Sequence, residues 1–348
     1  MNLSKRGCAA AVVQCATLLA GLFLLTAGPI AAEGSGQSGQ GGGVASVCAP
    51  GALGSPYIPV DSWVYPAVLR LYSLGYVDNV FLGMRPWTRA SVGHMVEAAG
   101  ARIEDANAGA ATDEAQEIYE ALMNELSEDS QGPCLAHRGS SRVESVYSVV
   151  RGISGTPLRD SYHLGSTIIN DYGRPYENGF NNYSGASGYA TAGPFTFYAR
   201  GEFEAAPSAS GYSRGLAQAL STVDGTTFGY NQTTIPMGPI ATLTNGRVME
   251  AFVSAHVLNH EISFGKQDEW LGPGVGGGMA YSNNAENIYS FRINRVEPLH
   301  IPLLSRLTGP FRYDFMVGPL QGHTYMPNPA NPGGSNPNLA NVIDPGNP

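Results

Sequence analysis

The sequence is poor in cysteine, in charged residues and in basic residues. Its four cysteines and seven histidines follow no zinc-site spacing, so we expect neither a metal nor a cofactor. Lysine and arginine number 19 against 28 acidic residues, and the formal net charge of −9 makes nucleic acid a poor partner. Only 14% of the residues are charged while glycine is abundant, which suits a β-rich protein with many turns better than a helical enzyme.

One long apolar run occurs at the N-terminus, where it predicts a signal peptide over residues 1–32. A short basic region precedes the run, and small residues near Ala32 offer a cleavage site. A membrane-anchoring helix is the alternative, but the next residues, 33–47, form a Gly/Ser-rich flexible leader without a basic stop-transfer cluster. Cys8 and Cys15 lie inside the run, which argues against a lipid anchor. Cleavage removes two basic and no acidic residues, so the net charge falls from −9 to −11.

Cys48 and Cys134 are the two cysteines that survive cleavage. In an exported chain an even pair most simply forms one disulfide, although two buried thiols are the alternative. Three helical patterns lie between the two cysteines. The disulfide would therefore staple a helical module over residues 48–138, whose core is small enough to benefit from it.

The three predicted helices have apolar stripes at helical spacing. The first begins after a cap at Asp61 or Ser62 and ends at Gly75. Its predicted buried face consists of Val64, Val68, Leu71 and Tyr72. The second starts at Thr88 and continues to about residue 101. The third spans residues 112–129, with an apolar residue every four positions at Ile118, Leu122 and Leu126.

The hydrophobic period changes to two after residue 139, which predicts antiparallel strands over residues 139–322. The segments 195–204, 289–294 and 311–317 each alternate apolar with polar or charged residues, so each strand has one apolar and one polar face. Two architectures fit such strands. In a soluble sandwich the apolar face is the core, whereas in a transmembrane barrel it meets lipid and the charged face lines a wet lumen.

Three features favour the transmembrane barrel. Aromatic residues gather in the connecting regions, as girdles at the membrane interfaces require; these are Tyr172, Tyr183, Tyr189 and Tyr212. Arginine and glutamate recur at adjacent polar positions, which suits a lumen with ion pairs. A tight turn follows Leu258, whereas residues 205–247 and 268–287 form long connections like external loops. The predicted fold is therefore mainly β, an antiparallel transmembrane β-barrel with a small all-α N-terminal module.

A glycine loop satisfies the dinucleotide-binding pattern G-x-G-x-x-G at Gly272, Gly274 and Gly277. That pattern binds a pyrophosphate where it connects a buried strand to a helix. Here the preceding residues, 266–269, are all polar, and the following segment alternates like a strand. We therefore interpret the loop as a chain reversal at the rim of the sheet, with Trp270 at the membrane interface or stacked on a sugar.

Two separated segments, Tyr57–Arg89 and Glu261–Ile288, resemble the Wzi capsule-assembly family of bacterial outer-membrane proteins. The resemblance covers most of residues 55–320. It implies an outer-membrane β-barrel preceded by a periplasmic helical bundle, acting as a lectin-like anchor and not as an enzyme. It also implies three partners: capsular polysaccharide or exopolysaccharide, the outer-membrane lipid, and the barrel-assembly machinery.

Five residues in and after the glycine loop are the candidate glycan contacts on this hypothesis. They are Asp268, Trp270, Asn283, Asn284 and Arg292. Each has a structural alternative: a tryptophan commonly anchors at a membrane interface, adjacent asparagines commonly form a turn, and an arginine on a polar strand face commonly pairs with an acid.

The barrel is expected to be incomplete in this chain. Outer-membrane barrels usually close with a strand that ends in an aromatic residue, whereas residues 323–348 form an irregular tail rich in proline, asparagine and glycine. We identify about seven to nine strand candidates after residue 139, whereas single-chain barrels start at about eight strands and the resemblance implies a considerably larger barrel.

Three other functions stay open. A porin-like channel would set its selectivity with charged strand residues, namely Arg200, Glu202, Arg292, Arg312 and Asp314. A glycosidase would use Glu202 and Glu204 as acid and base, although same-face carboxylates on a strand are more often solvated. A faint likeness of the helical module to S-layer homology repeats, at Trp63, Leu71 and Gly75, suggests a cell-wall-binding protein.

Overall fold

The computed structural model describes residues 54–78, 80–106, 109–130, 140–155, 168–225, 235, 237, 239–295 and 298–319, the side chains of 127–130 and 224 excepted. The chain divides into two compact units, residues 1–47 and 48–348, and all the described residues belong to the second. The predicted signal peptide and leader, the predicted disulfide between Cys48 and Cys134, and the predicted tail from residue 323 lie outside the described residues.

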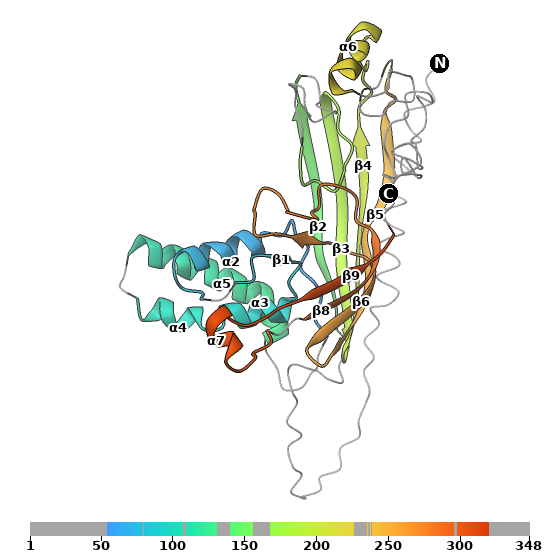
Figure 1. The fold of residues 1–348 in the computed structure, drawn as a ribbon. Helices are drawn as coiled ribbons and strands as arrows, with labels where there is room; N and C mark the ends of the chain where they lie inside the picture. Colours follow the sequence, from blue (N-terminus) through green and yellow to red (C-terminus); the bar gives the residue numbers. More distant parts are fainter. Residues whose placement is uncertain are drawn as a thin grey trace, which may run out of the picture. The chain divides into compact units, whose positions relative to one another are not determined.

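Four helices form the N-terminal part of the described chain (Figure 1). They are α2 (Val64–Ser73), α3 (Arg89–Val96), α4 (Ala99–Glu104) and α5 (Ala110–Ser130). Their apolar stripes meet in one core, where Val68, Leu71, Leu122 and Leu126 are fully buried. We call residues 54–130 the helical module. Its helices lie where the apolar spacing predicts them, because burial of a stripe stabilises a helix that its own propensity would leave marginal.

Two details of the predicted helices are wrong. Tyr72 is 42% exposed, and Tyr65 completes the buried stripe of α2 in its place, donating its hydroxyl to the backbone oxygen of Ile58 at 2.7 Å. The second predicted helix is two helices, since the chain breaks between α3 and α4. The predicted start of that helix is confirmed, because the Thr88 hydroxyl accepts a hydrogen bond from the backbone N–H of Ser91 at 3.2 Å.

Seven antiparallel strands form one sheet, in which sequence neighbours are also spatial neighbours. They are β2 (Ser140–Ile153), β3 (Gly179–Ala192), β4 (Phe195–Ala206), β5 (Leu243–Val257), β6 (His260–Lys266), β8 (Tyr289–Arg295) and β9 (Asp314–Val317). The order runs from β2 at one edge to β9 at the other, so the described fold is mainly antiparallel β, as predicted. None of the described helices is both long enough and apolar enough to cross a lipid bilayer.

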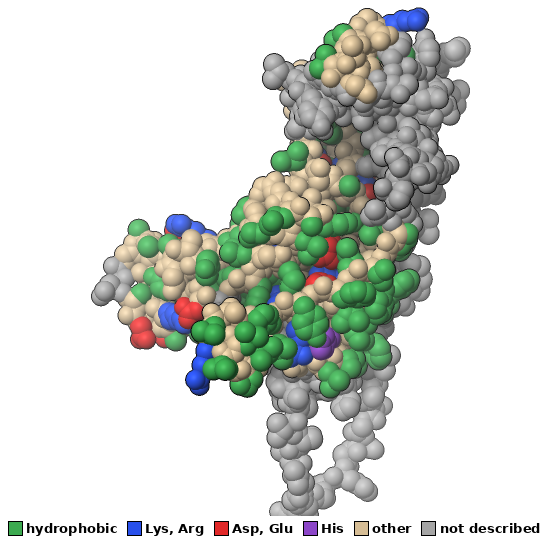
Figure 2. All heavy atoms as spheres, in the orientation of Figure 1, with side chains coloured by type: hydrophobic (Ala, Val, Ile, Leu, Met, Phe, Trp, Pro, Cys, Tyr) green, Lys and Arg blue, Asp and Glu red, His purple; other side chains and the backbone are tan. Residues whose placement is uncertain are grey.

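The sheet exposes its apolar face and buries its charged face. On β4, Phe197 is 51% exposed, whereas Arg200 is 6% and Glu202 is 5% exposed. The same alternation holds on β8, where the two aromatic residues are exposed and Arg292 is completely buried. In Figure 2, hydrophobic side chains gather around β6, β8 and β9. This is the reverse of the burial that the soluble-sandwich alternative requires.

The connections between strands differ in part from the predicted loops. Leu258 and Asn259 both have positive φ, 51° and 61°, and make the predicted tight turn between β5 and β6. The long loop predicted over residues 205–247 is shorter at both ends, because β4 runs to Ala206 and β5 starts at Leu243. A helix, α6 (Arg214–Asp224), lies between these two strands, and a short helix, α7 (Leu304–Thr308), lies between β8 and β9.

The glycine loop is bound to the helical module instead of standing free at the rim. Its first residues form β7 (Trp270–Leu271), which pairs with β1 (Met84–Arg85) of the module. The N–H of Gly272 continues this pairing by donating to the oxygen of Gly83 at 2.8 Å. Gly272 has a φ of +136°, and a Cβ there would lie 2.7 Å from the nitrogen of Met279, so the reversal requires glycine.

Candidate functional site

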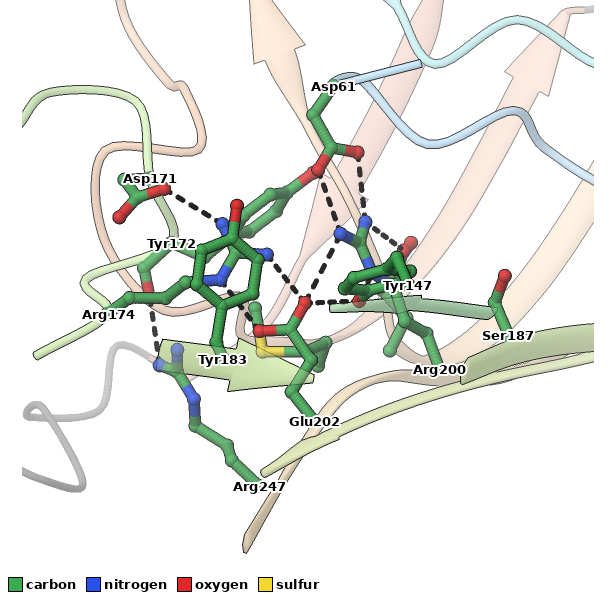
Figure 3. Close-up of polar contacts among 12 residues, drawn as sticks. Asp61, Tyr147, Asp171, Tyr172, Arg174, Tyr183, Ser187, Arg200, Glu202 and Arg247 are labelled. Carbon is green, nitrogen blue, oxygen red and sulfur yellow. Dashed lines mark hydrogen bonds and ion pairs between the residues drawn. The ribbon is translucent and has the colours of Figure 1, made fainter. Parts of the chain in front are cut away.

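The buried polar face of the sheet carries a network of ion pairs that reaches the helical module (Figure 3). Strands β4 and β5 supply alternate charged residues to this face, because side chains of a strand point to opposite sides with a period of two. The connection between β2 and β3 and the chain just before α2 supply further partners. A charge buried in this way costs several kcal/mol unless it is paired, so the partners decide whether the face is stable.

Glu202 is the centre of the network. Both its oxygens accept hydrogen bonds from the Arg174 guanidinium, from Nε and Nη2, each at 2.6 Å. The Tyr147 hydroxyl donates to the same carboxylate. Gly185 lies between these groups, and a Cβ on it would stand 2.7 Å from Cγ of Glu202, so the absence of a side chain there makes room for the contact. Arg174 also donates to Asp171 at 2.9 Å.

Arg200 connects the sheet to the helical module. Its Nη1 and Nη2 donate to the two oxygens of Asp61 at 2.9 and 2.8 Å, in the two-point geometry that suits a guanidinium and a carboxylate. Burial acts to raise the pKa of Asp61, but the charge and hydrogen bonds of Arg200 outweigh it and hold the pKa below its ordinary value. Asp61 was a predicted helix cap; the structure instead gives it this longer-range partner, and Ser62 accepts from the N–H of Val64 at 3.3 Å.

Asp268 is a second connection between the module and the sheet region. Its carboxylate accepts from the backbone N–H of Val60 at 2.7 Å, from the Tyr172 hydroxyl at 2.8 Å and from the Asn287 amide at 2.7 Å. Burial, reinforced by the charge of Asp61, raises the pKa of Asp268 above its ordinary value. These bonds hold the start of the glycine loop against the chain that leads into α2.

Glu269, beside Asp268, is almost completely buried with few partners. The nearest cation is Arg292, whose Nη2 lies 3.5 Å from Oε1, while Oε2 is a buried atom without a hydrogen bond among the described residues. Burial is the main cause that raises the pKa of Glu269 to about 8. The charge of Arg292 lowers this pKa, and the charges of Asp314 and Asp268 raise it. Burial thus favours the protonated form of Glu269.

The predicted glycan contacts divide into four buried residues and one exposed residue. Asp268, Trp270, Asn283 and Arg292 are buried, and Arg292 Nη1 lies 3.4 Å from the backbone oxygen of Asp268. The backbone oxygen of Asn283 accepts from the N–H of Tyr172 at 2.7 Å. Asn284 is exposed, and its side-chain oxygen accepts from the backbone N–H of Asn170 at 2.9 Å. The structure thus gathers four of the five around the base of the glycine loop.

Sequence reasoning missed Asp61, Tyr147, Arg174 and the true position of Tyr172. Tyr172 and Tyr189 were predicted in an interfacial girdle, but both are buried in small hydrophobic clusters, Tyr172 with Met249 and Trp270 and Tyr189 with Tyr198 and Phe252. The strand period offered a signal for Tyr198, which lies two residues before Arg200 and shares its face. No local signal exists for the pairing of Asp61 with Arg200 or of Arg174 with Glu202, because these partners are 139 and 28 positions apart in the sequence.

The arrangement can hold charge and position loops, and the two carboxylates of the glycosidase alternative are already paired with arginines. Glu202 has both oxygens bonded to Arg174, and Glu204 is paired with Arg247, so the geometry does not present them as the acid and base of the glycosidase alternative. His256 and His260 lie on the two paired strands β5 and β6, where they contact Glu261 and Tyr313 respectively. The described residues contain no group of three or more potential ligands that could hold a metal ion.

Comparison with known proteins identifies one family. The family model described as capsule assembly protein Wzi matches residues 149–334, which is more than half of the chain. The match includes the segment Glu261–Ile288 of the predicted resemblance and the strands of the network from β3 onward, whereas Tyr57–Arg89 lies before it. The comparisons with curated proteins and with solved structures gave no match. From its matched strands and loops, the chain belongs to the Wzi family of capsule assembly proteins.

Proposed function

We propose that this protein lies in the outer membrane and retains capsular polysaccharide or exopolysaccharide at the cell surface, without catalysing a reaction. The observation that carries the proposal is the inverted sheet, with its apolar face exposed and its charged face buried. The role in capsule assembly follows from the family, and the sheet supports lipid as the medium in which that role is performed.

Exposed apolar side chains occur on every strand of the sheet. They are Val143, Val146 and Val150 on β2, Phe180 on β3, Phe195 and Phe197 on β4, Val248, Val253 and Val257 on β5, Phe264 on β6, Tyr289 and Phe291 on β8, and Phe315 and Val317 on β9. Apolar surface left in water costs roughly 25 cal/mol per Å², so a continuous face of this kind needs a cover. Acyl chains provide it, as they do for the outer face of transmembrane barrels.

The helical module serves in this proposal as a periplasmic plug for an antiparallel barrel. The Arg200–Asp61 pair and the hydrogen bonds of Asp268 join it to the polar face, which would line the lumen. A barrel whose lumen is blocked by such a plug would conduct few ions, which disfavours the porin-like alternative. Barrel closure requires every strand edge to be paired, so the barrel-assembly machinery is the proposed partner during insertion.

The glycine loop, which pairs with the helical module through β7 and β1, is the proposed glycan contact. Asn284 supplies an exposed amide, and the buried Asp268, Trp270, Asn283 and Arg292 hold the loop in shape. An amide can donate to and accept from the hydroxyl groups of a sugar. Asn284→Ala should weaken binding of purified capsular polysaccharide, whereas Asn124→Ala, on the exposed side of α5, should leave it unchanged.

Capsule retention in cells tests the proposed function. We expect deletion of the gene to leave polysaccharide synthesis unchanged but to move polysaccharide from washed cells into the medium. Returning the intact gene should restore the amount of cell-bound polysaccharide. Envelope fractionation should place the protein in the outer membrane as a band whose mobility changes on boiling. Equal cell-bound polysaccharide with and without the gene would overturn the proposal, as would recovery of the protein in the soluble fraction.

A further inference from the structure

A polar cleft lies between the helical module and the inner face of strands β2, β3 and β4. Its volume is about 330 Å³. We propose that this cleft binds a neutral sugar unit, so that the inner face of the sheet and the module together form a second glycan site, separate from the glycine loop. The inference rests on the proposed function, because it assumes that the polysaccharide is the ligand. The size suits about one or two sugar residues, at the small end of ligand pockets.

Aromatic residues line the cleft from both sides. Trp63, at the start of α2, is 48% exposed, although tryptophan is usually the most costly side chain to leave in water. On the opposite wall, Tyr147 and Tyr183 meet edge to face with ring centroids 6.2 Å apart. The C–H faces of a pyranose ring stack on such surfaces. The Tyr183 ring already carries the guanidinium groups of Arg151 and Arg174, at 4.6 and 4.2 Å from its centroid, so Trp63 is the stacking surface of the cleft. A sugar on Trp63 would remove apolar surface from water and keep its hydroxyls at the polar rim.

Two carboxylates in the cleft, those of Glu144 and Asp61, are held in position by other protein groups. Glu144 accepts from Ser187 at 3.0 Å and from the Tyr198 hydroxyl at 2.8 Å, both at the same oxygen, Oε2. Asp61 is paired with Arg200, and its side chain is still 34% exposed. A carboxylate has about four acceptor sites, so acceptor capacity is left for sugar hydroxyls. Side chains fixed in advance lose little entropy when a ligand binds.

The charges of the cleft select a neutral sugar. Its lining contains the acids Asp61, Glu125 and Glu144 and only two arginines. Both arginines are engaged, Arg89 with Glu125 at 2.7 Å and Arg200 with Asp61. Both lining arginines are thus already committed to acids of the protein, so the lining offers a uronic acid no arginine of its own for its carboxylate, which disfavours it. The ligand that the lining fits best is an uncharged hexose or N-acetylhexosamine unit.

Titration calorimetry on the purified full chain in detergent micelles tests the site, with maltotriose, chitotriose and trigalacturonate as probes. We expect at least one of the two neutral probes to bind, and trigalacturonate to bind at least tenfold more weakly. Trp63→Ala should weaken binding of that neutral probe by tenfold or more. Tyr72→Ala is the matched control, because Tyr72 is an exposed aromatic residue of the same helix that does not line the cleft.

Fluorescence gives a second readout, since Trp63 is exposed while Trp87 and Trp270 are buried. The bound neutral probe should protect Trp63 from iodide quenching, and Trp63→Phe should abolish the protected signal. The cleft proposal is overturned if neither neutral probe binds at millimolar concentration, if trigalacturonate binds better, or if Trp63→Ala binds like the wild type. Failure of the proposed function is distinct: the probe would bind at Trp63, yet deletion of the gene would leave the capsule on the cells.

Discussion

Arg200 and Asp61 stand 139 positions apart in the sequence and form a two-point ion pair, with distances of 2.9 and 2.8 Å between nitrogen and oxygen. One residue belongs to β4 and the other to the chain that leads into α2. The pair therefore fixes the helical module against the polar face of the sheet. Because Arg200 is almost fully buried, its charge needs acidic partners, and Asp61 lies nearer than Glu202 at 3.4 Å and Glu250 at 3.8 Å.

Asp61→Asn is expected to destabilise the protein by about 2 kcal/mol, because it removes the two-point carboxylate partner of the buried Arg200 guanidinium and leaves the longer contacts to Glu202 at 3.4 Å and Glu250 at 3.8 Å. Thermal unfolding in detergent, followed by circular dichroism, measures the effect. Asp78→Asn is the control: the Asp78–Arg102 pair is exposed, and its loss should leave the melting temperature almost unchanged. Equal effects of the two substitutions would contradict a special role for the buried pair.

Glu269→Gln should change how stability depends on pH. Burial raises the pKa of Glu269 to about 8 in the folded protein, whereas an unfolded glutamate loses its proton near its ordinary pKa of about 4.3. The folded state is thus penalised increasingly as pH rises from about 4.3 to about 8, since only the unfolded state releases the proton freely. The variant should melt like the wild type at pH 4 and several degrees higher at pH 9. Glu97→Gln, at an exposed helix end, is the control and should leave the dependence of the melting temperature on pH unchanged. If the melting temperature of Glu269→Gln followed the wild type at every pH, the raised pKa of Glu269 would be refuted.

Gly272→Ala should disturb the glycine loop and its pairing with the module. The φ of +136° and the 2.7 Å approach to Met279 leave no room for a Cβ, so we expect a cost of about 1–3 kcal/mol. Faster trypsin cleavage in residues 266–295 and a lower melting temperature would report it. Gly276→Ala, where a Cβ meets nothing within 4 Å, should behave like the wild type.

Phe197→Arg tests the medium around the apolar face. In lipid, an arginine on the outward apolar face of a strand is costly, the more so the nearer it lies to the middle of the bilayer, and it should reduce the amount of assembled protein in the outer membrane. In water, the same exposed position would accept arginine with almost no cost. The heat-modifiable band in the outer-membrane fraction is the measurement, with Phe197→Leu as a control that keeps the face apolar. Unchanged assembly of the arginine variant would argue against lipid contact.

The predicted disulfide between Cys48 and Cys134 is tested by alkylation of the protein purified from the envelope. We expect no alkylation of either cysteine before reduction and alkylation of both after it. Cys48→Ser should lower the stability of the helical module by about 2–4 kcal/mol. Modification of both thiols without reduction would favour the alternative of two buried thiols.

Helix positions and strand faces followed from local patterns. The stripes of α2 and α5 repeat every three to four residues, and the alternation in β4 and β8 repeats every two, so burial of one face is encoded within a few neighbouring residues. The tight turn at Leu258 was also predictable, because it is marked by the few residues between two neighbouring strands. Tyr72 was misplaced because two tyrosines, Tyr65 and Tyr72, border the stripe of one helix, and only the packing of the module selects between them.

The sequence by itself determined the class of this protein: an acidic chain whose strands have one apolar and one charged face, with a family resemblance in its loop segments. Only the tertiary structure decided which face is buried and which acids are paired. Alternation is the same whether the apolar face meets a core or lipid, so it cannot choose between them. Likewise, Asp61 reaches Arg200, and Asp268 reaches Val60, across more than a hundred residues. Such partners depend on how distant segments pack, which no local pattern contains.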